Sequence, residues 1–141
     1  MDANELARRV ANHMLAAEGT GPSWGIQIEE VRADYARVSM VVRAEMLNGH
    51  RFAHGGMIFA LADTAFAYVC NGANHASMAA QASIVFLDKV REGERLVAEA
   101  IEVAREGRAG VTRVAVSAGD GRKVAEFTGY SRTVGGAVVE I

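Results

Sequence analysis

The sequence predicts an α+β fold in which a curved antiparallel sheet wraps around one long central helix. A helix-length segment, Gly55 to about Gly72, has no polar face, and four strand-like segments follow it with only turns between them. A single short amphipathic helix precedes these elements. Because a helix that is apolar on all sides is buried on all sides, and because strands joined by short turns pair antiparallel, we expect the sheet to curve around the helix.

The N-terminal part is expected to hold one helix and two strands. Leu6, Val10, Met14 and Leu15 recur at helical spacing and predict a helix over 6–18. Residues 19–22, Gly-Thr-Gly-Pro, end it, because glycine caps helices and proline cannot continue them. Strands are predicted at about 24–31 and 35–43, and the second alternates cleanly between apolar and mostly polar positions.

The remaining strands follow a loop over 44–54 and the long helix. They are predicted at 77–87, 95–104, 111–118 and 123–133, and the turns between the last three contain Gly107 and Gly121. Nothing in the composition divides the chain, so residues 1–141 are expected to form a single domain.

Composition excludes several classes of function. The 15 basic and 17 acidic residues leave a net charge of −2, which argues against nucleic-acid binding. Cys70 is the only cysteine and can form no disulfide within the chain. The acidic N-terminus does not resemble a signal peptide, and the apolar segment from Met57 to Cys70 is too short to span a bilayer and contains Asp63. We therefore expect a cytoplasmic protein with no membrane partner.

Asp63 and the glycines before the helix are the first candidates for chemistry. A carboxylate in an apolar helix is costly unless it is compensated, and desolvation makes it a stronger base. His54-Gly55-Gly56 stands where the helix begins, so the N–H of Gly55 or Gly56 could polarise a carbonyl group. The structural alternatives are an Asp63 that caps a neighbouring backbone group and glycines that serve only a turn.

The spacing along the helix suggests a site shared between two chains. Gly56 and Asp63 are two turns apart and face nearly the same side, but they are separated by about 10 Å along the axis. Both cannot contact one carbonyl group within a single subunit. A base from a partner chain would close the gap.

Other chemistries are less well supported. His50 and His54 have the spacing of zinc ligands on a helix, but the residues between them lack the metalloprotease glutamate. Cys70 lies in an apolar helix, where a thiol stays protonated and unreactive. Asn48-Gly49 is a common turn pair that turn chemistry alone can explain.

Taken in order, these motifs resemble a known family. Asn48-Gly49-His50, His54-Gly55-Gly56 and the segment 61–67, Leu-Ala-Asp-Thr-Ala-Phe-Ala, are similar to the hotdog-fold acyl-CoA thioesterases of the PaaI type, which act in phenylacetate catabolism. The similarity continues through 83–87 and 127–132 and covers about Trp24 to Gly136. The resemblance implies dimers whose sheets join, commonly a dimer of dimers (a homotetramer), with active sites at the dimer interface.

The resemblance also implies roles for single residues. Asp63 would be the general base or the nucleophile, the Gly55 N–H would polarise the thioester carbonyl, Asn48 would orient the water or the carbonyl, and His54 would shape the oxyanion site. Substrate contacts would come from Gly56, Thr64, Arg108 and Gly110. The phosphates of CoA need cations, for which Lys89, Arg91 and Arg132 are further candidates. Asp88-Lys89 stands where the family often has Arg-Pro, which puts a phosphate contact at Asp88 in doubt.

The sequence therefore predicts an enzyme that hydrolyses aryl-acetyl-CoA, namely phenylacetyl-CoA or its ring-hydroxylated derivatives, and needs no metal or other cofactor. A dehydratase or hydratase of the same fold and a non-catalytic acyl-CoA-binding module are the alternatives. Release of free thiol distinguishes hydrolysis from both.

Overall fold

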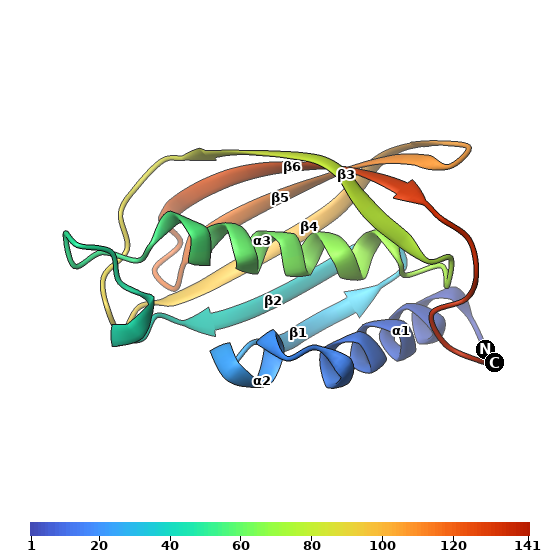
Figure 1. The fold of residues 1–141 in the computed structure, drawn as a ribbon, viewed down its shortest axis with the longest axis horizontal. Helices are drawn as coiled ribbons and strands as arrows, with labels where there is room; N and C mark the ends of the chain where they lie inside the picture. Colours follow the sequence, from blue (N-terminus) through green and yellow to red (C-terminus); the bar gives the residue numbers. More distant parts are fainter.

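The computed structural model describes all 141 residues and contains one six-stranded sheet and three α-helices. The helices are α1 (Ala3–Ala17), α2 (Thr20–Trp24) and α3 (Gly55–Cys70), and a 3-10 turn, η1 (Ala44–Met46), precedes α3. The strands are β1 (Gln27–Arg32), β2 (Tyr35–Val41), β3 (Ser77–Phe86), β4 (Arg95–Glu106), β5 (Ala109–Ala118) and β6 (Lys123–Thr133). Every strand pair is antiparallel. Figure 1 shows the sheet curving over α3.

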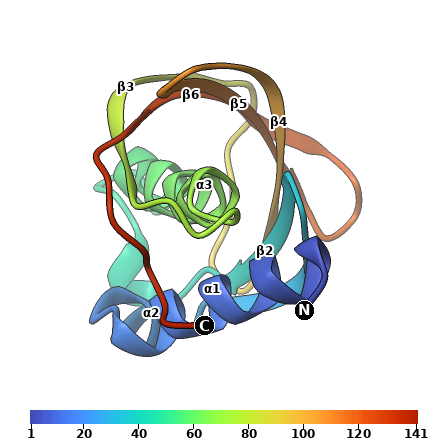
Figure 2. The same cartoon turned by 90° about the vertical axis from the view of Figure 1, so that its right-hand side faces the viewer.

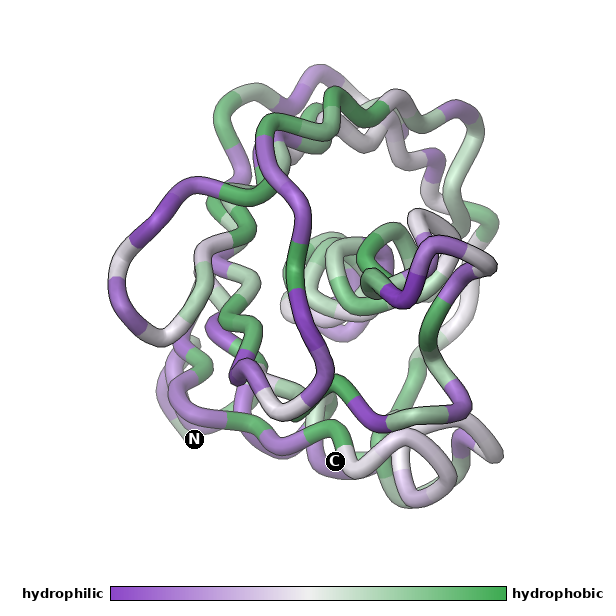
Figure 3. The backbone as a smooth tube through the Cα atoms, turned by 90° about the vertical axis from the view of Figure 1, so that its left-hand side faces the viewer, coloured by the Kyte–Doolittle hydropathy of each residue, from purple (hydrophilic) through white to green (hydrophobic).

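The central helix is α3, as the sequence predicts. Seen end-on, it runs through the concave side of the sheet, with α1 and α2 beneath it (Figure 2). Leu61, Ala62 and Ala65 are fully buried on it, and the helix is coloured mainly as hydrophobic in Figure 3. This is the hotdog fold that the resemblance implies.

The strand order, β1-β2-β4-β5-β6-β3, departs from a simple run of hairpins. β4, β5 and β6 are joined by hairpins, but β3 crosses over and pairs with β6 instead of β4. β3 is therefore an edge strand with one free side, and it exposes Met78, Val85 and Phe86. Periodicity identifies a strand but not its neighbour, so the sequence did not reveal this crossover.

Close packing between α3 and the sheet requires glycine at one position. A Cβ atom added to Gly129 of β6 would lie 2.8 Å from three ring carbons of Phe66. Phe66 and Phe127 are both buried, with ring centroids 5.8 Å apart. The face of the Phe66 ring thus rests directly on the backbone of β6, which brings α3 close to the sheet.

Three details of the sequence prediction are wrong. The N-terminal helix spans Ala3–Ala17 and begins earlier than predicted, because Asp2 and Glu5 form a capping box. Residues 20–24, expected to end the first helix and to begin the first strand at Trp24, form the short helix α2, which ends at Gly25 with φ +68°, so that β1 begins at Gln27. α3 is not covered on all sides either, because Gly56, Ala60, Asp63, Thr64 and Ala67 stay partly or fully exposed on one stripe. None of the helices is long and apolar enough to cross a membrane.

Candidate active site

The first turn of α3 presents one unpaired backbone N–H group. His54 is the N-cap residue, and its Nδ1 accepts a hydrogen bond of 2.9 Å from the Gly56 N–H. The next two N–H groups, those of Met57 and Ile58, donate to the carbonyl of His54. The Gly55 N–H makes no hydrogen bond. Of the two donors suggested by the sequence, Gly55 is therefore available to a ligand and Gly56 is not.

His54 acts on this site through its ring. An Nδ1 atom that accepts a hydrogen bond carries no proton, so the ring is the neutral tautomer with its proton on Nε2. The bond fixes the helix start and therefore the direction of the Gly55 N–H. This hydrogen bond gives His54 a structural role as the N-cap of α3, and its part in an oxyanion site stays a prediction.

Asn48 stabilises the loop that faces the helix start. Its Oδ1 accepts hydrogen bonds from the backbone N–H groups of His50 (2.9 Å) and Phe52 (3.1 Å), so turn chemistry does account for part of its role. The Nδ2 group has no partner within the chain. Because Oδ1 is occupied, Asn48 can serve a ligand as a donor through Nδ2.

Gly55 and Asn48 line the same cavity, which we call the loop cavity. It has a volume of about 610 Å³, and its walls include His50, Phe86 and Lys89. A Cβ atom on Gly55 would lie 3.0 Å from Cζ of Phe86, so a larger residue would require this half-exposed ring to shift by a few tenths of an ångström. An anion or a polarised carbonyl oxygen in this cavity would meet the positive end of α3.

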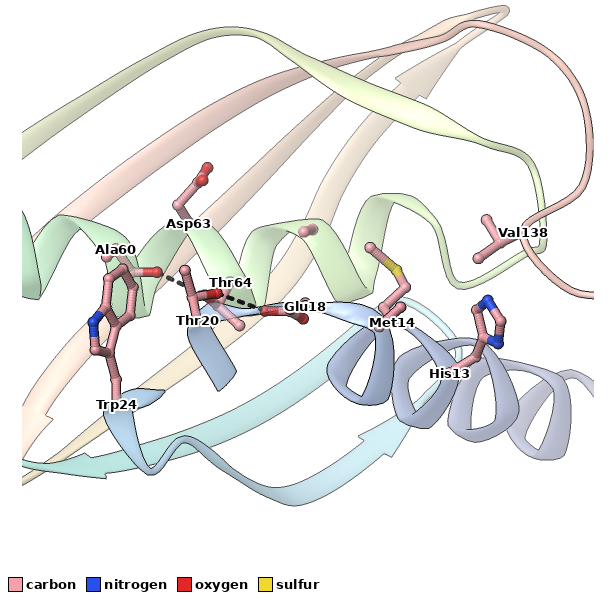
Figure 4. Close-up of a pocket in the computed structure, with 11 residues that line it drawn as sticks. His13, Met14, Glu18, Thr20, Trp24, Ala60, Asp63, Thr64 and Val138 are labelled. Carbon is pink, nitrogen blue, oxygen red and sulfur yellow. Dashed lines mark hydrogen bonds between the residues drawn. The ribbon is translucent and has the colours of Figure 1, made fainter. Parts of the chain in front are cut away.

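Asp63 lies in a second cavity, which we call the helix cavity. This cavity has a volume of about 510 Å³ and lies between α3 and the N-terminal helices, with walls that include His13, Met14, Glu18, Trp24, Thr64 and Ala67. Asp63 lies at its edge, and Figure 4 shows its carboxylate pointing from α3 away from Trp24 and Met14. Asp63 has no hydrogen-bond partner, and partial burial raises the pKa of its carboxyl group. A carboxylate held this way is a better base than one in water.

The structure does not bring Asp63 and Gly55 together within one chain. They belong to different cavities and lie eight residues apart on α3, about 12 Å along the axis at 1.5 Å per residue. Thr64 does not bond Asp63 either, since its hydroxyl donates to the Ala60 carbonyl at 2.7 Å. The separation predicted from sequence is therefore present in the fold.

The candidate cations fall into two groups. Lys89 lines the loop cavity, and Lys89 and Arg91 both lie over the ring of Phe52 at 5.0 and 5.5 Å. Arg108 and Arg132 are at the other end of α3, where Arg108 shares a cavity with Cys70.

Gly110 lies at this end of α3 as well, and a Cβ atom on it would meet Ser131 Oγ at 2.7 Å, which gives this glycine a packing role. The substrate contacts of Arg108 and Gly110 stay predictions.

Asp88 has a structural partner instead of a ligand. Its carboxylate pairs with Arg122 at 2.9 Å, and Arg122 also binds Glu94 and Asp120. This cluster joins the β5–β6 turn to the segment before β4. The acidic residue at position 88 is thus explained by its neighbour.

The remaining candidates from the sequence find no chemical setting. His50 and His54 are not part of any group of three or more His, Cys, Asp or Glu side chains that could hold a metal. Burial raises the pKa of the Cys70 thiol to about 12, so the thiol stays protonated.

Met14 and Trp24 line the helix cavity beside Asp63. Sequence reasoning did not single them out, because Met14 was assigned to a helix core and Trp24 to a strand.

Three comparisons with known proteins bear on this site. Residues 50–125 match the family described as the thioesterase superfamily. The chain is 38% identical to acyl-coenzyme A thioesterase PaaI of Escherichia coli K12 over 129 residues, which are 91% of each sequence.

Solved structures give the same relationship. The E. coli PaaI protein from the phenylacetic acid degradation operon aligns with a TM-score of 0.94 and 35% identity, covering 96% of this chain and 99% of its own. A hypothetical thioesterase of Streptococcus pneumoniae, solved with coenzyme A, aligns with a TM-score of 0.77 and 25% identity over 79% of this chain and 90% of its own.

Proposed function

The chain belongs to the thioesterase superfamily, and from this premise we propose that it hydrolyses aryl-acetyl-CoA thioesters to the free acid and CoA. It is an acyl-CoA thioesterase of the PaaI type. The aryl-acetyl preference, for phenylacetyl-CoA or its ring-hydroxylated derivatives, is the proposed part. The observation that carries the mechanism is the unpaired Gly55 N–H at the start of α3, on the helix that also holds the unpaired carboxylate of Asp63.

The proposed reaction uses Asp63 as a general base. Asp63 takes a proton from water, the water oxygen forms a bond to the acyl carbon, and negative charge develops on the carbonyl oxygen. The Gly55 N–H and Asn48 Nδ2 donate to that oxygen; one such donor contributes about 3–4 kcal/mol. The C–S bond then breaks, and the proton held by Asp63 passes to the thiolate of CoA.

An alternative role for Asp63 is direct attack on the acyl carbon. That step gives a mixed anhydride and CoA thiolate, and water then hydrolyses the anhydride. A single turnover in ¹⁸O-labelled water distinguishes this route when the label appears in the Asp63 carboxylate, read by mass spectrometry of its peptide.

The proposed site is completed by a second chain. Gly55 and Asp63 lie about 12 Å apart along α3, which is too far for both to contact one carbonyl group. The free edge of β3, with its exposed apolar side chains, can pair with the same strand of a partner. We place the Gly55 and Asn48 of one protomer opposite the Asp63 of the other. The protein then works as a dimer or as a dimer of dimers, and neither form needs a metal or another cofactor.

The loop cavity is the proposed site of the CoA end of the substrate. Lys89 and Arg91 are the cations next to this cavity, and phosphate groups need positive partners. Replacing Lys89 with alanine is expected to raise KM with little change in kcat.

Thiol release is the experiment that tests the function. Wild type and Asp63→Asn are compared on a panel of acyl-CoA substrates, and aryl-acetyl-CoA turnover is expected to fall at least a hundredfold in the variant, about 2.7 kcal/mol or more of lost transition-state stabilisation. Loss of enoyl-thioester absorbance without thiol would instead identify a dehydratase or hydratase. Binding without turnover in the wild type would identify a binding module.

Complementation between subunits tests the shared site. Asn48→Asp keeps the Oδ1 acceptor for the loop and replaces only the Nδ2 donor, so it is a matched variant. Co-expressed with Asp63→Asn, it forms mixed dimers in which one site is intact, and activity should return to about one quarter of the wild-type value. Mixed dimers as inactive as both parents would show that each site lies within one chain.

A further inference from the structure

The segment between β3 and β4 turns its basic side chains toward the loop cavity. Residues 88–94 read Asp-Lys-Val-Arg-Glu-Gly-Glu, so acidic and basic groups stand within a few positions of each other. Nζ of Lys89 and Cζ of Arg91 lie 5.0 and 5.5 Å from the ring centroid of Phe52, which lines the loop cavity. The cations of this segment therefore gather on the side of the cavity.

Arg122, in the turn between β5 and β6, holds the acidic side chains at both ends of the same segment. Its Nε pairs with the Asp88 carboxylate at 2.9 Å, and its Nη2 donates to Glu94 Oε1 at 2.9 Å. Its Nη1 pairs with Asp120 at 2.9 Å, and Nη2 also donates to the Lys89 carbonyl at 3.3 Å. One guanidinium group thus binds three carboxylates and one backbone carbonyl, and it fixes the segment at its first and last residues.

Asp88 is the member of this cluster that a ligand would meet, because it lines the loop cavity beside Lys89. Both oxygens of its carboxylate have partners, since Oδ1 accepts from the Lys89 N–H at 2.8 Å and Oδ2 pairs with Arg122. Arg122 itself is not among the residues that line the cavity. A carboxylate without its cation at this wall would repel the phosphate groups of CoA, because like charges a few ångströms apart destabilise each other.

We propose that Arg122 is a positioning residue for substrate binding, which offsets the charge of Asp88 and thereby lets Lys89 and Arg91 attract the phosphate groups of CoA. The proposal rests on the proposed function, because it places the CoA end of the substrate in the loop cavity. Arg122 acts through Asp88 and through the backbone of Lys89, and it contacts no part of the substrate.

The test is the binding of CoA itself, measured by titration calorimetry at low ionic strength. Arg122→Gln leaves Asp88 without its cation, and the Kd for CoA should rise about threefold to tenfold, as expected for one like charge several ångströms from a phosphate group. The rise should largely disappear in about 1 M salt, where the Debye length is about 3 Å. For phenylacetyl-CoA, KM should rise in the same way while kcat stays unchanged, because the affected contact binds ground state and transition state alike.

A second substitution separates the charge of Asp88 from the structure of the cluster. Asp88→Asn in the Arg122→Gln protein restores no ion pair but removes the unpaired charge, so Kd should return to the wild-type value or below it. Asp120→Asn in the same protein is the matched control, since it removes an identical charge from the same cluster but does not line the loop cavity. It should leave Kd raised. Asp88→Asn alone should lower Kd, because the charge of Arg122 is then no longer offset at the cavity.

The outcomes separate this inference from the proposed function. A wild type that releases thiol from phenylacetyl-CoA, while Arg122→Gln binds CoA as tightly as wild type, overturns the role of Arg122 and leaves the function standing. Equal recovery by Asp88→Asn and Asp120→Asn, or recovery by neither, overturns that role as well. A wild type that shows the expected pattern of CoA binding but releases no thiol overturns the hydrolysis and leaves the binding role of Arg122 standing. Circular dichroism of each variant confirms that it is folded.

Discussion

Replacing Gly129 with alanine tests the packing that holds α3 against the sheet. The new Cβ atom would lie 2.8 Å from Cδ1, Cδ2 and Cε1 of Phe66, whereas ordinary contacts begin at 3.4 Å. The ring or the backbone must therefore move by at least about 0.6 Å, the difference between these distances, inside a close-packed core. Phe66 is buried against Phe127, so the ring has little free space.

The expected loss of stability follows from two opposing effects. Overpacking costs about 1–3 kcal/mol, and alanine gains about 0.5–1 kcal/mol over glycine in a strand through the unfolded chain. With an overpacking cost in the middle of its range, about 2 kcal/mol, the free energy of unfolding should fall by about 1–1.5 kcal/mol, which corresponds to a drop in Tm of about 3–6 °C for a chain of this size. Because Asp63 is on the same helix three residues before Phe66, kcat/KM should fall as well.

The assay is urea unfolding followed by circular dichroism, at a fixed protein concentration because association would change the apparent stability. Gly49→Ala is the control, since nothing lies within 4 Å of a Cβ atom at that position. Phe66→Leu in the same chain should recover part of the loss, giving a coupling energy in a double-mutant cycle. A Gly129→Ala protein as stable as wild type, or exact additivity with Phe66→Leu, would refute this account of the packing.

Three further predictions concern the site. His54→Ala removes the acceptor for the Gly56 N–H, so it should lower the free energy of unfolding by about 1 kcal/mol in chemical denaturation and should also lower activity. His54→Asn should recover most of the stability, because asparagine also caps helices. Equal stability of all three proteins would contradict the capping role. Burial raises the pKa of Asp63, so between the unfolded and folded pKa values the native state binds more protons than the unfolded state, and stability falls as the pH rises through this window. The unfolding free energy of Asp63→Asn relative to wild type should therefore increase over the same window and level off above it. A difference that does not depend on pH would argue against desolvation of Asp63. Burial raises the pKa of Cys70 to about 12. A disulfide reagent at pH 8 should therefore titrate no thiol in the folded protein and one thiol per chain in urea. Fast reaction of the folded protein would show that Cys70 is accessible, and the thiol-release assay would then need a correction for it.

Much of the fold follows from the sequence because it depends on local periodicity. The apolar run of α3, the alternation in β2 and the glycines in the turns are readable from neighbouring residues. The family motifs mark the start of α3 and its acidic residue in the same way. The about 10 Å between Gly56 and Asp63 is likewise a property of helix geometry, so the sequence alone pointed to a shared site.

What only the tertiary structure decided depends on contacts between distant segments. The crossover of β3 to β6 is a choice of neighbour that periodicity does not contain. The selection of Gly55 over Gly56 as the free donor depends on the rotamer of the His54 ring, and the donor role of Asn48 depends on which backbone groups its Oδ1 meets. The helix cavity forms because Trp24 on α2 packs against α3, some 40 residues later in the chain. The burial of apolar surface that drives this packing is not directional, so the local sequence does not reveal it. The sequence indicated which residues are proposed to carry the chemistry, and tertiary packing decided which of their atoms are free to do so.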